Sequence, residues 1–210
     1  MVSPFDKYEA DDPDFDVEHG VLKNKLAITD ARALEHAENQ ALISAYDQAA
    51  LSYTETHAFT SDDVRNLHRI FLGDIFDWAG EYRNIDISSP GIRWCHARFI
   101  DAEMAKFNGR LAKLTPFSPD MSREEILSRS AEIHGELIMI HPFREGNGRT
   151  GRLLGDLLLM QAETLPMELT ELDDTEIREE YFAAIRDVWT RADYTRLIRI
   201  FDLLVPKSSP

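Results

Sequence analysis

One short segment, residues 141–152, concentrates the side chains of this sequence that could do chemistry. It reads HPFREGNGRTGR and holds three of the ten glycines in the chain. Glycines at the start of a helix let its free N–H groups approach a ligand closely, and the helix dipole adds an attraction for anions. Arg149 and Arg152 supply two guanidinium forks that match the geometry of a phosphate. The segment is therefore predicted to hold phosphate at a helix start.

A carboxylate and an imidazole accompany this anion site. Glu145 is a hard oxygen ligand, and a single carboxylate with phosphate oxygens and waters is a usual way to hold Mg²⁺. His141 can accept a proton, because an imidazole titrates close to neutral pH. A glycine-rich loop beside a buried histidine is often inert, but this combination of residues arises by chance only about 10⁻¹¹ times per starting position. We therefore interpret the segment as a site of nucleotidyl or phosphoryl transfer.

Composition excludes several classes of protein. The chain has 210 residues, which fits one domain, and 43% of them are hydrophobic, which argues against disorder. The formal net charge of −15 disfavours direct binding to nucleic acid or to an anionic membrane surface. We find no apolar run of the roughly 18 residues that a membrane span needs, and no secretory signal pattern. The single cysteine, Cys95, permits no intrachain disulfide, so a cytoplasmic location is expected.

Helical periodicity and capping signals dominate the elements that must position the site. We predict an all-α bundle with one β-hairpin. Pro142 ends the helix before the site, because the residue preceding a proline is pushed out of the α region. The helix after the site is apolar on more than one side, so residues 153–160 are expected in the core. The helices are predicted at 29–50, 61–76, 101–114, 122–140, 147–160, 174–190 and 193–204.

A Pro-Gly turn marks the expected hairpin, with strands at 83–88 and 92–96. A lone two-stranded hairpin is marginal in water, so this one either packs on the helices or pairs with another chain. Residues 1–18 carry seven acidic side chains against one lysine, which favours a solvated tail. We therefore predict an acidic tail over 1–18, a single domain over 19–204 and a short tail over 205–210.

The segment 141–152 resembles the signature of Fic-domain proteins, HPFx[D/E]GNGRxxR, at every fixed position. A weaker likeness extends over about residues 19–204, through GVLKNKL at 20–26, DIFDWAG at 74–80 and the hairpin that follows. The resemblance implies a Fic-type helical bundle with the hairpin, called the flap, beside the active-site loop. It also implies a protein adenylyltransferase, which moves AMP from ATP to a Ser, Thr or Tyr hydroxyl of a target protein and releases pyrophosphate.

Each position of the signature then acquires an implied role. His141 would take the proton of the target hydroxyl, Glu145 would hold Mg²⁺, and Phe143 would be a buried anchor. Ile87 and Trp94 of the flap are candidates for clamping the target segment. The phosphates would be bound by the backbone N–H groups of Gly146, Asn147 and Gly148, by the Asn147 side chain, and by Arg149 and Arg152. Gly148 favours AMP transfer, because the death-on-curing branch of kinases carries lysine there.

Fic enzymes are commonly silenced by a helix with the pattern [S/T]xxxE[G/N], whose glutamate pairs with the second signature arginine. The nearest copy here, Glu38-Asn39, has Leu34 at the Ser/Thr position, and Glu145-Gly146 has His141 there. The resemblance thus implies a toxin whose inhibitory helix lies on a separate small antitoxin, and type II topoisomerases are a first target to test. Two alternatives stay open: a transferase that uses another donor (UMP, phosphocholine or phosphate), and an inactive peptide-binding module.

Overall fold

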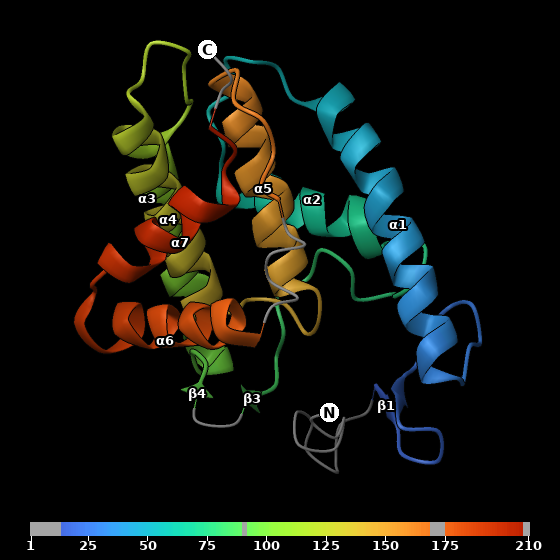
Figure 1. Cartoon of the computed structure of the whole chain (residues 1–210). Coiled ribbons are helices and arrows are strands. Elements are labelled where there is room, and N and C mark those ends of the chain that lie inside the picture. Colours follow the sequence, from blue (N-terminus) through green and yellow to red (C-terminus); the bar gives the residue numbers. More distant parts are fainter. Residues whose placement is uncertain (1–13, 90–91, 169–174, 208–210) are drawn as a thin grey trace.

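The computed structural model describes residues 14–89, 92–168 and 175–207, and within them seven α-helices surround a common core (Figure 1). Two short antiparallel ribbons accompany the helices, so the expected mostly helical fold with a hairpin is confirmed. The helices are α1 (Ala31–Ser52), α2 (Ser61–Leu72), α3 (Ile100–Leu114), α4 (Arg123–Ile140), α5 (Asn147–Gln161), α6 (Thr175–Arg191) and α7 (Thr195–Leu204). The ribbons pair β1 (Phe15–Asp16) with β2 (Val21–Leu22), and β3 (Ser88–Ser89) with β4 (Ile92–Arg93).

Helices α4 and α5 form the centre of the bundle, and the loop between them is the segment with the candidate chemistry. They pack on each other, while α4 also contacts α3, α6 and α7, and α5 contacts α1 and α2. Leucines fill the inner faces of α5, and Leu153, Leu154 and Leu158 are fully buried. Met160, which was also expected in the core, is 46% exposed, so that part of the prediction is wrong. The loop is thus held between two helices that many neighbours keep in place.

Helix α2 is four residues shorter than its apolar pattern predicts. It begins with a capping box between Thr60 and Asp63 and ends before Gly73. Ile75 and Phe76 are buried, but they belong to a turn in which both N–H groups bond to the carbonyl of Leu72. Burial therefore continues beyond the helix end, which explains why the apolar pattern runs past it.

Two residues of the predicted tails, Phe15 and Val205, are buried in the core. Phe15 pairs with Leu22 across the first ribbon and is only 5% exposed, because it packs in the apolar core instead of facing solvent. Val205 is also buried, and the Arg123 guanidinium donates to the backbone carbonyls of Val205 and Pro206. The acidic stretch 1–13 and residues 208–210 lie outside the described residues.

The second ribbon is the predicted hairpin, reduced to two residues per strand. Its register pairs Ser88 with Arg93 and Ser89 with Ile92, and the turn at 90–91 lies outside the described residues. Side-chain bonds replace the ladder at its base, since the Asp86 carboxylate accepts hydrogen bonds from the Ala97 N–H and the His96 ring. The hairpin packs on the helical core through Trp94 and Cys95, as one of the two sequence alternatives requires.

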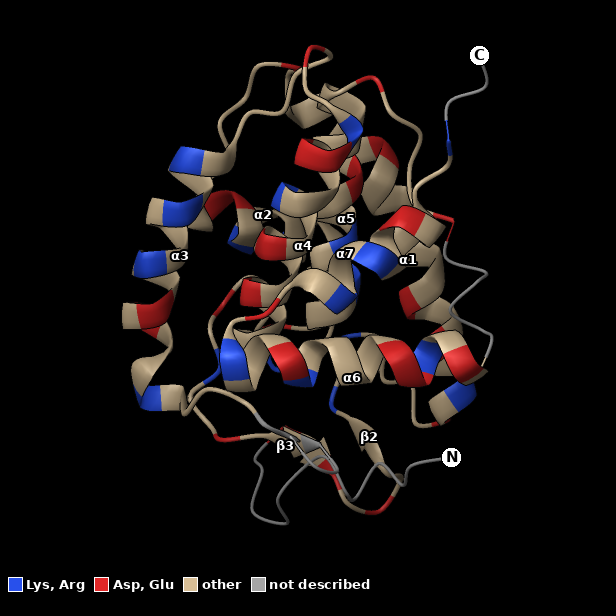
Figure 2. Cartoon of the chain, turned by 60° about the vertical axis from the view of Figure 1, so that its left-hand side comes forward, with Lys and Arg blue, Asp and Glu red and all other residues tan. Residues whose placement is uncertain are grey.

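Charges of both signs lie along the outer helices, as on α6 in Figure 2. Some form ion pairs, for example Arg191 with Asp187 within α6 and Arg196 of α7 with Glu180. Such exposed pairs contribute little to stability. Among the described residues, every helix is too short or too polar to cross a lipid bilayer.

Candidate active site

His141 stands at the point where α4 turns into the loop. It is the C-cap residue, with left-handed backbone angles of φ 50° and ψ 58°, and Pro142 prevents the helix from continuing. Its ring Nδ1 lies 3.3 Å from the carbonyl oxygen of Ile138. If Nδ1 carries the proton and donates to that carbonyl, Nε2 is the atom with the lone pair. The expected base therefore has a defined ring nitrogen for accepting a proton.

Asn147 and Phe143 close the loop on itself. The Asn147 side chain accepts a hydrogen bond from the Phe143 N–H at 2.8 Å and donates one to the Phe143 carbonyl at 2.7 Å. The Phe143 ring is fully buried, as the implied anchor role requires. The Asn147 side chain thus holds the loop, and its Nδ2 has a second N–H beyond the one that donates to Phe143, so phosphate binding by this side chain stays a prediction.

His68 of α2 supports the loop from the core, and the sequence analysis missed it. Its ring stacks on Phe143 with a centroid distance of 3.8 Å. Its Nδ1 accepts from the Gly80 N–H at 2.8 Å, so its Nε2 donates to the Glu145 carbonyl at 2.9 Å. Burial lowers the pKa of His68 to about 4, which keeps the ring neutral and this bonding pattern intact. The available signal was its place on the buried face of α2, between Leu67 and Phe71.

Gly146 and Gly148 differ in the space that a side chain would have at each position. Gly146, the N-cap of α5, has φ +79°, and a Cβ there would lie 2.8 Å from Leu72 Cδ1 and 3.2 Å from Phe71 Cε1. A Cβ on Gly148 would meet only Arg152 Nη1, at 3.8 Å, and otherwise open space. Since Gly146 has no side chain, the N-cap makes no side-chain hydrogen bond to the first N–H groups of α5, and such groups at a helix start can bind an anion.

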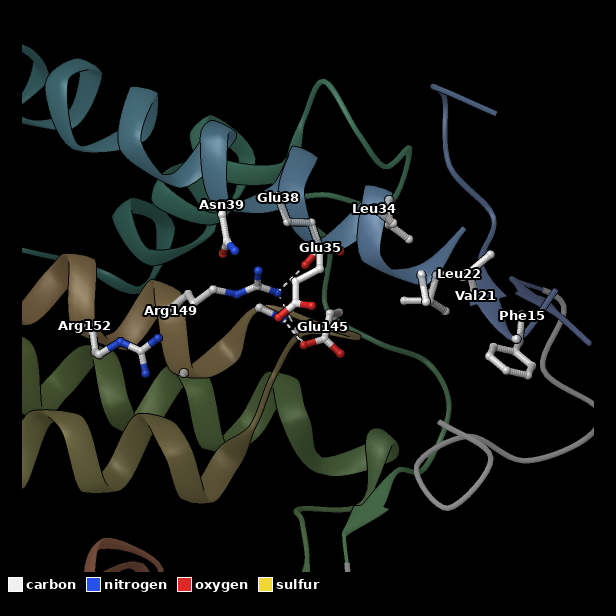
Figure 3. A pocket seen from close by; sticks show the side chains of 14 residues that line it. Phe15, Val21, Leu22, Leu34, Glu35, Glu38, Asn39, Glu145, Arg149 and Arg152 are labelled. Atoms are coloured by element: carbon white, nitrogen blue, oxygen red, sulfur yellow. Dashed lines mark hydrogen bonds and ion pairs between the residues drawn. The ribbon is translucent and has the colours of Figure 1, made fainter. Parts of the chain in front are cut away.

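A cavity of about 470 Å³ opens beside this helix start (Figure 3). The side chains of Arg149 and Arg152 extend into it from α5, and Glu145 joins them from the loop. Arg152 Nε is a buried donor for which the described residues provide no acceptor. Helix α1 and the first ribbon form the other walls, with Phe15, Val21, Leu22, Leu34, Glu35, Glu38 and Asn39. His141 lies at the opposite end of the loop, six residues before the start of α5.

Arg149 is held by carboxylates in this cavity. Its Nη2 lies 2.6 Å from Glu38 Oε2 and 3.7 Å from Glu145 Oε1, and its guanidinium carbon is 5.0 Å from the centre of the Phe71 ring. Glu38 is only 8% exposed, which makes this a partly desolvated ion pair. The glutamate of the incomplete inhibitory pattern therefore reaches a signature arginine, although Leu34 replaces the expected Ser/Thr. Its partner is the first arginine of the signature and not the second.

The two flap residues singled out from the sequence have different surroundings. Ile87 is buried, with 6% of its surface exposed. Trp94 is half-buried and stacks on the His141 ring, with a centroid distance of 4.1 Å and planes 13° apart. The flap therefore lies beside the active-site loop, as the fold prediction states. Target clamping by these residues stays a prediction.

The metal prediction can be checked against the available donors. Within the described residues there is no cluster of three His, Cys, Asp or Glu side chains that could hold an ion by itself. Glu145 is the one signature carboxylate, and it lies beside the helix start, where its Oε1 accepts from the Gly146 N–H at 3.0 Å. One carboxylate suits a Mg²⁺ ion that arrives with phosphate oxygens and waters.

His134 and Cys95 lie outside the active-site loop. His134 is buried, and its Nε2 shares a hydrogen bond with the Tyr181 hydroxyl at 2.9 Å. Burial lowers the pKa of His134 to about 3. Burial also raises the pKa of the Cys95 thiol, which disfavours its reactive thiolate form.

The fold and the loop together define a helical domain with a glycine-rich helix start beside a cavity and an adjacent flap. Residues 58–159 match the Fic/DOC family. The probable protein adenylyltransferase Fic of Salmonella typhimurium is 30% identical over 148 residues, which cover 68% of this chain and 69% of that protein. The chain belongs to the Fic/DOC family.

Two further similarities extend this finding. The protein adenylyltransferase VbhT of Bartonella schoenbuchensis is 34% identical over 148 residues, which cover 70% of this chain but only 30% of VbhT. The crystal structure of BepC from Bartonella tribocorum, with bound AMPPNP, superposes with a TM-score of 0.77 at 17% identity, covering 93% of this chain and 97% of that one. The second similarity supports the fold over nearly the whole chain.

Proposed function

We propose that this chain is a protein adenylyltransferase that moves AMP from ATP to a hydroxyl side chain of another protein. One observation carries the proposal. A single loop places an imidazole at one end and, at the other, an uncapped helix start beside a cavity lined by Arg149 and Arg152. The names of the curated relatives and the nucleotide bound in BepC favour ATP as the donor.

In this reaction the target hydroxyl oxygen forms a bond to the α-phosphorus of ATP. The bond from that phosphorus to the oxygen of the departing pyrophosphate breaks. His141 Nε2 takes the hydroxyl proton, while its Nδ1 keeps the bond to the Ile138 carbonyl. Arg149, Arg152 and the first N–H groups of α5 stabilise the phosphates, because such transfer depends mainly on positioning and charge stabilisation.

Glu145 is the residue that would hold Mg²⁺ in this proposal. When bound, the ion neutralises phosphate charge. The Arg149–Glu38 pair must loosen or share its guanidinium when phosphate enters, since an anion and a carboxylate then face the same donors.

The finer parts of the proposal rest on the resemblance. We infer a toxin that is held inactive by a separate small antitoxin, because the chain has no intact [S/T]xxxE[G/N] pattern. Ile87 and Trp94 are proposed to contact the target segment, and a type II topoisomerase in the cytoplasm is the first target to test.

The test is incubation of the chain with lysate, Mg²⁺ and ATP labelled on either the α- or the γ-phosphate. Label from the α-phosphate alone, with an AMP mass added to an acceptor peptide, is expected. The His141→Ala variant should transfer nothing while it still binds ATP, and the matched variant at the exposed His36 of α1 should behave as the wild type.

Other outcomes separate the alternatives. Label from the γ-phosphate would indicate a kinase, and competition by UTP or CDP-choline would indicate another donor. Failure of the wild type to bind ATP in calorimetry would favour the peptide-binding module. Equal transfer by wild type and His141→Ala would remove His141 from its role.

A further inference from the structure

The ring of His141 is held on one face by an aromatic side chain of the flap. The indole of Trp94 lies parallel to the imidazole within 13°, at a centroid distance of 4.1 Å. The hydrogen bond from the ring Nδ1 to the Ile138 carbonyl is long at 3.3 Å. A bond of that length restrains rotation weakly. Stacking on Trp94 therefore adds the restraint on the ring plane that the hydrogen bond alone does not provide.

A buried arginine connects the same flap to the backbone of the base. Arg83 is only 5% exposed, and its N–H donates to the Pro142 carbonyl at 2.9 Å. Its Nε donates to the His141 carbonyl at 2.8 Å, and its Nη1 donates to the Ile85 carbonyl at 2.7 Å. Its Nη2 donates to the carbonyl of Cys95, the residue after Trp94. One guanidinium thus spans the segments on both sides of the flap and the first residues of the active-site loop.

We propose that Trp94 and Arg83 are positioning residues for His141, and that through them the flap sets the orientation of the base. This inference rests on the proposed transferase function and goes beyond the role of the flap in binding a target. Trp94 fixes the plane of the imidazole, so that Nε2 keeps one direction. Arg83 fixes the backbone from which that ring projects, relative to the segment after β4 that carries Trp94.

The same stacking also helps the proton transfer itself. Once Nε2 has accepted the proton, the ring is a cation lying on the face of an indole. The face of an indole is negative, so it attracts that cation. Trp94 therefore stabilises the state that follows proton uptake, in addition to orienting the neutral ring. Removal of the indole should lower kcat and leave ATP binding nearly unchanged, since Arg149 and Arg152 line a different end of the loop.

The experiment uses the full chain with ¹³C-labelled histidine and compares Trp94→Leu, Trp94→Phe and Trp189→Leu. Trp189 is an exposed tryptophan of α6 and provides the matched control. In the NMR spectrum the ring C–H signals of His141, assigned with His141→Ala, should be shifted upfield by the indole ring current. The shift should disappear in Trp94→Leu, persist in part in Trp94→Phe and stay unchanged in Trp189→Leu.

Kinetics supply the second readout. Trp94→Leu should lower kcat by roughly tenfold to a hundredfold, with KM for ATP within about twofold of the wild type, and Trp94→Phe should recover most of the loss. Arg83→Lys, which keeps the charge but lacks the planar fork, should lower kcat in the same manner. Circular dichroism verifies that each variant is folded.

Two results would overturn the inference: His141 signals at the same position in wild type and Trp94→Leu, or a Phe variant as slow as the Leu variant despite an intact stack. A different result tests the proposed function. If the wild type transfers no AMP, that function fails, while the ring-current measurement still decides whether Trp94 lies on His141. The two failures are therefore distinguishable.

Discussion

Gly146 and Gly148 are two residues apart, yet alanine should affect them in opposite ways. Alanine at Gly146 must adopt φ +79°, which costs about 1–2 kcal/mol for a residue with a Cβ. Its Cβ would also lie 2.8 Å from Leu72 in a packed core, and overpacking of this kind costs about 1–3 kcal/mol. The smaller entropy of the unfolded alanine chain offsets about 0.4–1 kcal/mol. We therefore expect Gly146→Ala to lower the free energy of unfolding by about 2–4 kcal/mol.

Gly148→Ala is the matched control for stability. Its Cβ meets open space, and alanine favours a helix over glycine by up to about 1 kcal/mol, so the stability should stay the same or rise slightly. Because Gly148 lines the cavity, the added methyl group should nevertheless weaken ATP binding. Urea unfolding and calorimetric titration with Mg·ATP measure the two effects. If Gly146→Ala unfolds at the same urea concentration as Gly148→Ala, the packing argument for the loop is wrong.

Three further predictions address the support of the loop and the charge of the cavity. The pKa of His68 is about 4 in the folded chain and about 6.5 when unfolded, so the unfolded chain binds more protons between these values. The contribution of His68 to the free energy of unfolding should therefore fall by about 3 kcal/mol as the pH drops from 7 to 4. In urea unfolding, the His68→Leu variant should lose correspondingly less stability over the same pH range. Glu38→Gln removes the carboxylate 2.6 Å from Arg149, and we expect about fivefold tighter ATP binding in calorimetry. Glu35→Gln, an equal charge change at an exposed position of the same cavity, should have a smaller effect, and weaker binding by Glu38→Gln would contradict this reasoning. Asn147→Ala should destabilise the chain by about 2–4 kcal/mol in thermal or urea unfolding, because two buried backbone groups lose their partners. Unchanged stability with lost ATP binding would instead assign that side chain to the phosphates.

The helices could be read from the sequence because their signals are local. The Ser122 cap, the stripe of α4 and the apolar faces of α5 each depend on residues a few positions apart, and their boundaries agree with the structure within one or two residues. The end of α2 was misjudged since Phe76 is buried by a turn, and apolar periodicity does not distinguish a turn from a helix. Phe15 was assigned to a tail because its neighbours in the sequence are acidic. It belongs instead to a short strand, and the partner strand begins six residues later.

The sequence by itself determined which residues form the signature and to which family it belongs. The signature of residues 141–152 has glycines, arginines, a carboxylate and an imidazole in one order, and their predicted roles come from the resemblance to Fic-domain proteins. The same residues identify the chain as a Fic-domain protein, and its similarity to the Fic/DOC family confirms this prediction. The family could be identified because the residues of the signature are neighbours along the chain.

Only the tertiary structure decided what surrounds that loop. Three contacts around the loop join residues that lie 47 or more positions apart in the chain. They are the ion pair of Glu38 with Arg149 and the ring stacks of Trp94 with His141 and of His68 with Phe143. No local pattern specifies such contacts, because they depend on how whole helices and the flap pack against one another. The surroundings of the imidazole and of the first arginine, which set their orientation and charge, are thus a product of the packed core.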